Sequence, residues 1–62
     1  MPYVNIRVAG TLTRDQKAKI ADEVTDTLHR VAGKPKEAVL IFIDEVEKDN
    51  IAKVGKLFDG QD

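Results

Sequence analysis

Apolar and polar side chains alternate at the start of the chain, and the period changes further along. Val4, Ile6 and Val8 alternate with more polar neighbours, which is the period of two of a strand with one face toward a core. From residue 20 to residue 32 apolar residues recur at steps of three and four. That spacing predicts a helix of about five turns with one apolar stripe. The chain is therefore expected to begin with a strand and an amphipathic helix.

Local signals predict where this helix begins and ends. Thr13 and Gln16 have the spacing of a capping box, in which each residue satisfies the backbone of the other. The helix should therefore begin directly after Thr13. Gly33 suits the left-handed position that follows a helix, and Pro35 prevents continuation. The helix should end near Ala32.

A second strand is expected after the helix. Residues 38–43 are apolar at every position, which is typical of a short strand covered on both faces. A strand, a helix and a second strand in this order form a βαβ unit, whose strands lie parallel with a right-handed connection. After a turn over residues 47–50, apolar pairs around Gly55 predict a short hairpin over residues 51–58. The expected fold class is α+β, with two parallel strands, one long helix and a C-terminal hairpin.

Two strands and one helix cannot enclose a hydrophobic core, so we expect copies of the chain to cover one another. A chain of this length buries only ~60% of the surface that it exposes when unfolded, and this one has no cysteine for a disulfide. Other copies should cover the free face of the second strand, so that folding and assembly are one event. We expect a single domain over residues 1–62, with residues 60–62 fraying, in a homo-oligomer.

Charge and composition exclude several classes of partner. Ten Lys and Arg against eleven Asp and Glu give a formal net charge of −1, which opposes an extended nucleic-acid surface and a ribbon-helix-helix DNA-binding dimer. The longest apolar run, residues 38–43, is far shorter than the ~20 residues that cross a bilayer. The first residues lack the pattern of a secretory signal. We expect a cytoplasmic protein that binds neither membrane nor nucleic acid.

The residues of most catalytic sites are scarce in this chain. Cysteine and serine are absent, and the single histidine, His29, has no partners in an arrangement typical of catalysis. It is interpreted as a surface residue. Asp44, Glu45 and Glu47 form an acidic group, but neighbouring residues of a strand point to opposite faces. We interpret the group as a solvated rim, and we expect no metal ion and no cofactor.

Pro2 is the remaining candidate for chemistry. An initiator Met before a small residue is usually removed, and removal of Met1 would leave proline as the first residue. Its nitrogen would then be a secondary amine, and free α-amino groups have a pKa of about 7.7–8.0. An apolar pocket lowers the pKa of an amine. Pro2 is thus suited to act as a general base near neutral pH.

Three segments carry a resemblance to a known family: Pro2–Val8, Leu12–Lys17 and Val39–Val46. Together they resemble the short 4-oxalocrotonate tautomerase family, and the likeness extends from Pro2 to about Leu57. The resemblance implies a β-α-β subunit that assembles into a homohexamer, a trimer of dimers. It also implies a cofactor-independent isomerase with Pro2 as general base, which moves a proton between enol oxygen and carbon of a small unsaturated keto or enol acid.

Three positions depart from the pattern of that family. Its members hold substrate carboxylates with two arginines, one before the helix and one in the second strand, and they carry an aromatic residue in the late loop. The matching positions here are Leu12, Leu40 and Ile51. Because guanidinium contacts to carboxylates are charge-assisted hydrogen bonds, their loss predicts modest turnover of a dicarboxylate. The three side chains would also make a substrate pocket more apolar.

Three cations are candidates to replace the missing arginines as substrate-binding residues: Arg7, Arg14 and Lys53. Arg7 should lie on the strand face opposite Pro2, because residues five apart in a strand point to opposite sides. Arg14 should lie in the first helical turn and Lys53 in the late loop. The alternative function is a tautomerase-like oligomer with weak or no catalysis that serves as a binding or structural module.

Overall fold

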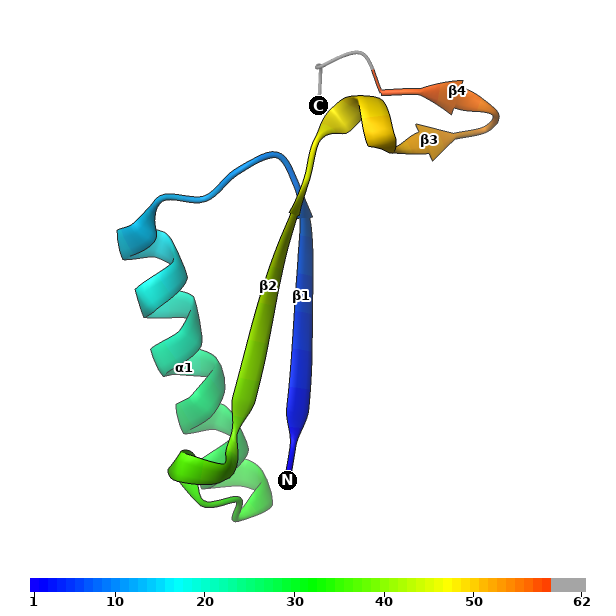
Figure 1. Cartoon of the computed structure of the whole chain (residues 1–62). Coiled ribbons are helices and arrows are strands. Elements are labelled where there is room, and N and C mark those ends of the chain that lie inside the picture. The colour runs from blue at the N-terminus through cyan, green and yellow to red at the C-terminus, as the bar shows by residue number, and fades with distance from the viewer. Residues whose placement is uncertain (59–62) are drawn as a thin grey trace.

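The computed structural model describes residues 1–58 and contains one helix beside a pair of long strands (Figure 1). The expectation that residues 60–62 fray lies outside the described residues. The elements follow in the order β1 (Tyr3–Ala9), α1 (Arg14–Ala32), the 3-10 turn η1 (Lys36–Ala38), β2 (Leu40–Val46), the 3-10 turn η2 (Lys48–Asn50), β3 (Ala52–Lys53) and β4 (Lys56–Leu57).

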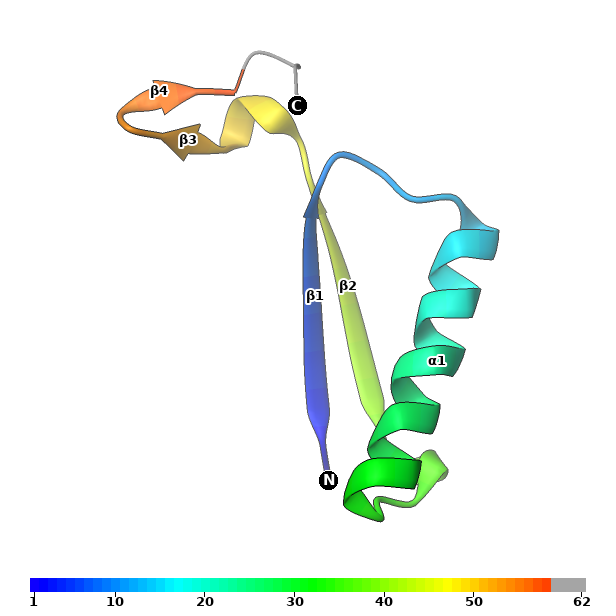
Figure 2. The same ribbon diagram turned by 180° about the vertical axis from the view of Figure 1, so that it is seen from behind.

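The strands β1 and β2 lie parallel, as the βαβ prediction requires. Their register runs from Tyr3 opposite Leu40 to Ala9 opposite Val46. The helix α1 lies along one side of this pair in both views, and the β3–β4 hairpin lies beyond the carboxyl ends of the strands (Figures 1 and 2). The predicted crossover and the predicted hairpin are both confirmed.

The helix boundaries agree with the local signals. The Thr13 hydroxyl accepts a hydrogen bond from the Gln16 backbone at 3.1 Å, and the Gln16 side chain accepts one from the Thr13 backbone at 2.9 Å. Gly33 follows the helix in the left-handed conformation, with φ 68°, and its N–H donates to the carbonyl of His29 at 3.0 Å. The capping box therefore begins α1 as predicted, and the glycine ends it.

The second strand differs from its prediction at both ends. The segment expected to begin at residue 38 begins at Leu40, because the N–H groups of Ala38 and Val39 donate to the carbonyls of Pro35 and Lys36 in η1. A backbone N–H that is used in a local turn is not available to a neighbouring strand. At the other end β2 continues beyond the apolar run to Val46, since charged residues near its end have partners.

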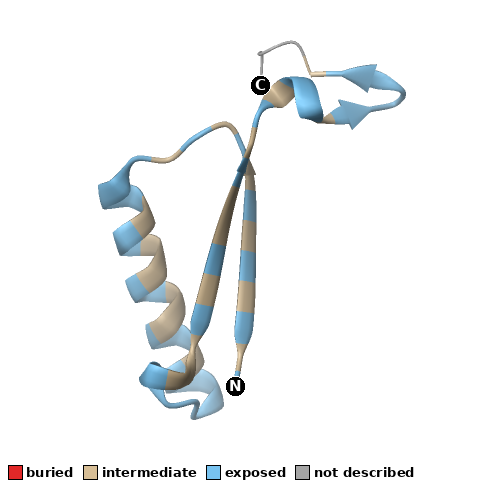
Figure 3. Ribbon diagram, viewed as in Figure 1, coloured by how far each residue is buried: buried red, intermediate tan, exposed pale blue. Residues whose placement is uncertain are grey.

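The two faces of the β1–β2 sheet have different surroundings. Val4, Ile6, Ile41 and Ile43 point toward α1 and are half-buried, and they alternate with exposed residues in β1 and in the first part of β2 (Figure 3). None of the described residues is fully buried. Within residues 1–58 only α1 covers this sheet (Figure 1), so one face of β2 has no partner in a single chain, as expected.

The other side of the sheet, which we call the open face, consists of Tyr3, Asn5, Arg7 and Ala9 of β1 and their partners in β2. Three large apolar side chains lie on it: Tyr3, 70% exposed, Leu40, 46%, and Phe42, 49%. The rings of Tyr3 and Phe42 meet edge to face with centroids 6.4 Å apart. A contiguous apolar patch of this kind marks an interaction surface.

One residue of the predicted apolar stripe is not covered. Ile20, Val24 and Leu28 of α1 are half-buried, but Val31 is 71% exposed. The last turn of α1 extends beyond the amino ends of the two strands (Figure 1). Val31 therefore has no sheet beneath it within one chain.

The hairpin turns at Val54 and Gly55, both of which have positive φ, 54° and 75°. This conformation suits glycine and is rare for a β-branched residue. Val54 is also 91% exposed. The tip of the hairpin thus presents an apolar side chain on a strained backbone.

Candidate active site

Pro2 lies at the amino end of β1. Its carbonyl accepts a hydrogen bond from the N–H of Leu40 at 3.0 Å, so the backbone of β2 holds the residue in place. Pro2 is half-buried, whereas Met1 before it is 81% exposed. The Leu40 side chain, which matches a family arginine, lies nearby on the open face.

Leu12, the other position that matches a family arginine, lies in the loop between β1 and α1. Its backbone N–H donates to the carboxylate of Glu45 at 2.7 Å, and the ammonium of Lys17 donates to the same carboxylate at 3.1 Å. Glu45 belongs to β2 and points toward α1, opposite Val8 in the strand register. The carboxylate thus joins three elements: the second strand, the loop and the first turns of the helix.

These contacts lower the pKa of Glu45. The hydrogen bond from the Leu12 backbone has the largest effect, and the hydrogen bond and charge of Lys17 also favour the ionised carboxylate. Because the pKa in the folded protein lies below that in the unfolded chain, ionised Glu45 stabilises the fold above the ordinary glutamate pKa of about 4.3. That contribution is lost as the pH falls through the lowered pKa.

Glu45→Gln should therefore weaken the attachment of the β1–α1 loop to β2 and reduce the pH dependence of the protein's stability. A neutral amide still accepts a hydrogen bond from Leu12, but it loses the charge that attracts Lys17. We expect faster hydrogen exchange at the Leu12 amide, measured by NMR at pH 6, and a smaller loss of thermal stability between pH 5 and pH 3 than in the unaltered protein. Glu37→Gln is the matched control, since Glu37 is exposed in η1. An equal loss of thermal stability between pH 5 and pH 3 in both variants would contradict the assigned contact.

The interpretation of the acidic group as a solvated rim missed the contacts that Glu45 makes with the loop and the helix. Asp44 and Glu45 do point to opposite faces, as strand geometry requires, but neither is merely solvated. Asp44 accepts from Arg7 Nε at 2.9 Å on the open face. The signal that could have identified Glu45 is its odd position in β2, which places it toward the helix and within reach of Lys17.

Arg7 lies on the open face, opposite in direction to Pro2, as predicted from strand parity. It also borders a groove of about 520 Å³ at the carboxyl end of the sheet, where η2 and the start of the hairpin pass beside the strand ends. The N–H of Phe58 donates to the carbonyl of Ile51 at 2.9 Å and closes this end of the groove. The lining residues are Arg7, Val8, Ala9, Val46, Asn50, Ile51, Ala52 and Phe58. We call it the Arg7 groove.

The candidate residues are divided between the two ends of the sheet. Pro2 and Leu40 lie at the amino ends of the strands, while Leu12 and Ile51 lie beyond the carboxyl ends. A seven-residue strand at ~3.3 Å per residue separates the two ends by roughly 20 Å. One chain therefore does not bring Pro2 to the Arg7 groove.

The two other candidate cations lie outside the groove. Arg14 is the first residue of α1 and is exposed. Lys53 is exposed in β3 opposite Lys56. His29 is exposed near the end of α1, with its Nδ1 3.0 Å from the carbonyl of Lys34, which agrees with its interpretation as a surface residue.

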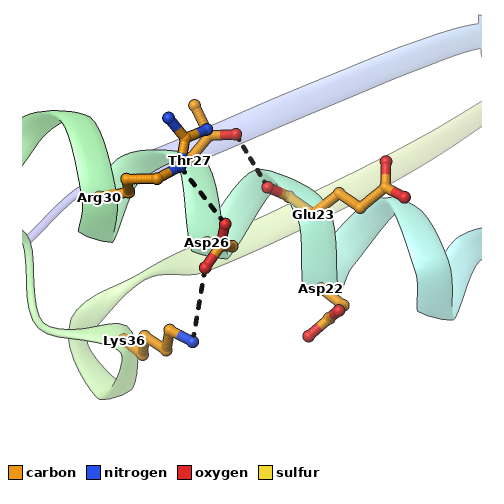
Figure 4. A pocket seen from close by; sticks show the side chains of 6 residues that line it. All are labelled: Asp22, Glu23, Asp26, Thr27, Arg30 and Lys36. Carbon is orange, nitrogen blue, oxygen red and sulfur yellow. Dashed lines mark hydrogen bonds and ion pairs between the residues drawn. The ribbon is translucent and has the colours of Figure 1, made fainter.

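A second hollow lies on the outer side of α1 and contains none of the candidate residues (Figure 4). Asp26 lies between two cations there, 3.6 Å from Arg30 Nε and 3.7 Å from Lys36 Nζ. All three side chains are more than half exposed. Such exposed pairs contribute ~0–1 kcal/mol each, and the pair with Lys36 connects η1 to the helix.

Comparisons with known proteins assign the chain to a family. A family model described as "Tautomerase enzyme" matches residues 2–60. A protein of Bacillus cereus named "Probable tautomerase" is 36% identical over 56 residues, covering 90% of this chain and 92% of the relative. A Bacillus subtilis protein named "2-hydroxymuconate tautomerase" is 34% identical over 56 residues, covering 90% of each chain. The chain belongs to the tautomerase family, and this membership supports an isomerase-type activity.

Solved structures share the same fold. The structure of YwhB, described as a homologue of 4-oxalocrotonate tautomerase, has a TM-score of 0.87 and 30% identity, and covers 98% of this chain and 100% of that one. DmpI from Helicobacter pylori has a TM-score of 0.81 and 29% identity, covering 90% and 88%. The predicted β-α-β subunit with a C-terminal hairpin is confirmed. Within residues 1–58 no helix is long and apolar enough to cross a membrane.

Proposed function

We propose that the chain is an isomerase that moves a proton between oxygen and carbon of a small keto or enol acid, with the Pro2 nitrogen as general base. The observation that carries this proposal is the family membership together with the placement of Pro2 at the start of a strand. The hydrogen bond from Leu40 holds Pro2, and exposed Met1 leaves the bond between the two residues accessible to removal of the methionine.

The proposed reaction uses one base for two proton transfers. The lone pair of the Pro2 nitrogen takes the proton of the enol hydroxyl, the O–H electrons form the carbonyl, and the carbon–carbon double bond shifts along the conjugated chain. The ammonium form of Pro2 then returns the proton to carbon. No redox partner is required, since the substrate and product are isomers.

Assembly of several copies completes the proposed site. The open face carries exposed Tyr3, Leu40 and Phe42, and a second copy that covers it would remove apolar surface from water. Pro2 and the Arg7 groove lie at opposite ends of the β1–β2 sheet of one chain. A pocket that contains both must therefore combine Pro2 of one copy with the groove of another. The homohexamer of the resembling family, in which Leu12, Leu40 and Ile51 would be apolar pocket walls, fits this requirement.

Replacing the proposed base tests the function directly. Pro2→Ala replaces the secondary amine with a primary amine and removes the ring, and we expect ketonisation of phenylenolpyruvate and 2-hydroxymuconate to slow by about 10²–10⁴-fold, the contribution of a positioned general base. Rates should be followed by ultraviolet absorbance. Protein that retains Met1, verified by intact mass, should be equally slow, because its Pro2 nitrogen is an amide.

Pro35→Ala is the matched control, since it changes the chain's other proline, which directly precedes η1. It should leave the rates unchanged. Equal rates for the unaltered protein, Pro2→Ala and the uncatalysed background would remove the proposed isomerase function. The second candidate, a tautomerase-like oligomer that binds without turnover, would then account for leucines at both positions that match family arginines.

A further inference from the structure

We infer that Arg7 anchors the substrate carboxylate, so that the Arg7 groove takes small acids with one carboxylate and an apolar body in preference to dicarboxylates. This inference rests on the proposed function and names the substrate class and the anchor of the same site. It is carried by the one cation among the described lining residues and by the apolar character of six of the other seven.

The groove residues match a ligand with one charged end. Among the lining residues that the structure describes, Arg7 supplies the one charge, Asn50 supplies a neutral polar side chain, and none is a carboxylate. The other lining residues are apolar: Val8, Ala9, Val46, Ile51, Ala52 and Phe58. A hollow with mostly apolar walls and few polar groups is typical of sites for small organic ligands. A second carboxylate would have to lie against these apolar walls unpaired, which disfavours dicarboxylates.

The guanidinium retains donors for a ligand. Asp44 contacts Arg7 at Nε, 2.9 Å away, and a guanidinium has five N–H donors in a fixed fork. Within residues 1–58, Arg7 forms its ion pair through Nε, and its terminal nitrogens form no ion pair. Two parallel N–H donors suit a carboxylate. Asp44 therefore competes with the ligand for the charge of Arg7.

Arg7 is favoured over the other candidate cations by its position. Arg14 and Lys53 are exposed and border neither the groove nor its apolar walls. Arg7 also shares the open face with Phe42, which we expect a neighbouring copy to cover. The anchor would thus lie at the edge of the assembled interface, where a Pro2 from another copy can approach.

Binding of unreactive acids tests the anchor without any turnover. We would titrate the assembled 15N-labelled protein with 3-phenylpropanoate and with adipate, and follow the amides of Ala9 and Ala52 by NMR. The monocarboxylate should shift these amides at lower concentration than the dicarboxylate. Arg7→Met should weaken 3-phenylpropanoate binding about tenfold, the effect of losing a charged hydrogen-bond donor, and Arg7→Lys should recover part of it.

Two further variants complete the test. One should change binding in the direction opposite to Arg7→Met, and the other should leave it unchanged. Asp44→Asn removes the competing carboxylate, and we expect binding to tighten by about two- to fivefold, the range of an exposed ion pair. Arg30→Met is the matched control, because Arg30 is a similarly exposed arginine paired with an aspartate on α1. It should leave binding unchanged. Unchanged binding in Arg7→Met, or weaker binding in Asp44→Asn, would overturn the anchor.

Kinetics separate this inference from the proposed function. If Pro2→Ala abolishes turnover while Arg7→Met leaves KM and binding unchanged, the base stands and the anchor is wrong. If the unaltered protein shows no turnover but binds 3-phenylpropanoate through Arg7, the groove is a binding site and the isomerase proposal fails. If both hold, Arg7→Met should raise KM for phenylenolpyruvate more than it lowers kcat.

Discussion

Copies that carry Pro2→Ala and copies that carry Arg7→Met should regain activity when they are refolded together. In the proposed site the base and the anchor come from different copies, because roughly 20 Å separates the ends of β1. A mixed oligomer therefore contains pockets in which both residues are intact. With equal amounts and random assembly, roughly a quarter of the pockets should be complete. Ketonisation of phenylenolpyruvate at concentrations below KM, where the weaker binding of Arg7→Met lowers its rate, would measure the recovery.

Each variant refolded alone is the control and should stay at its own low rate. A mixture of unaltered protein with Pro2→Ala calibrates the mixing, since its activity should fall in proportion to the altered bases. No recovery in the mixture of Pro2→Ala with Arg7→Met, in oligomers shown by mass spectrometry to contain both chains, would mean that one copy supplies both residues. The assignment of the pocket to two copies would then be wrong.

Phe42→Glu should separate the copies and unfold the chain at micromolar concentration. Phe42 lies in the middle of the open face beside Tyr3, and burial of a phenylalanine contributes about 1.5–3 kcal/mol. The substitution also places a carboxylate where an apolar surface is needed. We expect the dissociation constant to rise on the order of 100-fold. Light scattering and circular dichroism over a dilution series would show dissociation and loss of helix together.

Ala18→Glu is the matched control for charge. Ala18 is exposed on α1, and glutamate is a good helix former, so this variant should keep the assembly and the melting temperature. A Phe42→Glu chain that remains folded as a monomer would contradict the coupling of folding to assembly. A Phe42→Glu chain that remains oligomeric would show that copies associate through another surface.

The elements that depend on neighbouring residues could be predicted from the sequence. The capping box at Thr13 and Gln16 and the glycine at residue 33 act within a few residues, so α1 begins and ends where expected. Strand parity is equally local, and it placed Arg7 opposite Pro2 correctly. The start of β2 was less predictable, because η1 takes two backbone amides from the apolar run by bonds that the apolar pattern does not reveal.

The candidate site was predictable only in part. The choice of Pro2 as the base came from its position and from the family resemblance, and it stays a prediction. The role of Glu45 depends on the loop and helix that pass above β2, which a linear pattern of charges does not show. The Arg7 groove forms where residues far apart in the sequence meet, so no single motif predicts it. The proposed pocket, which joins Pro2 to this groove, requires more than one chain.

Proline differs in one respect from the residues that act as general bases through a side chain. Its ring has no freely rotating side chain, so the location of the nitrogen follows from the backbone alone, and the bond to the Leu40 amide is what fixes that backbone. Ordering the ring loses almost no side-chain entropy. The position of the base for proton transfer would then depend on the alignment of β1 with β2. A change in strand alignment would misplace the nitrogen and slow the reaction.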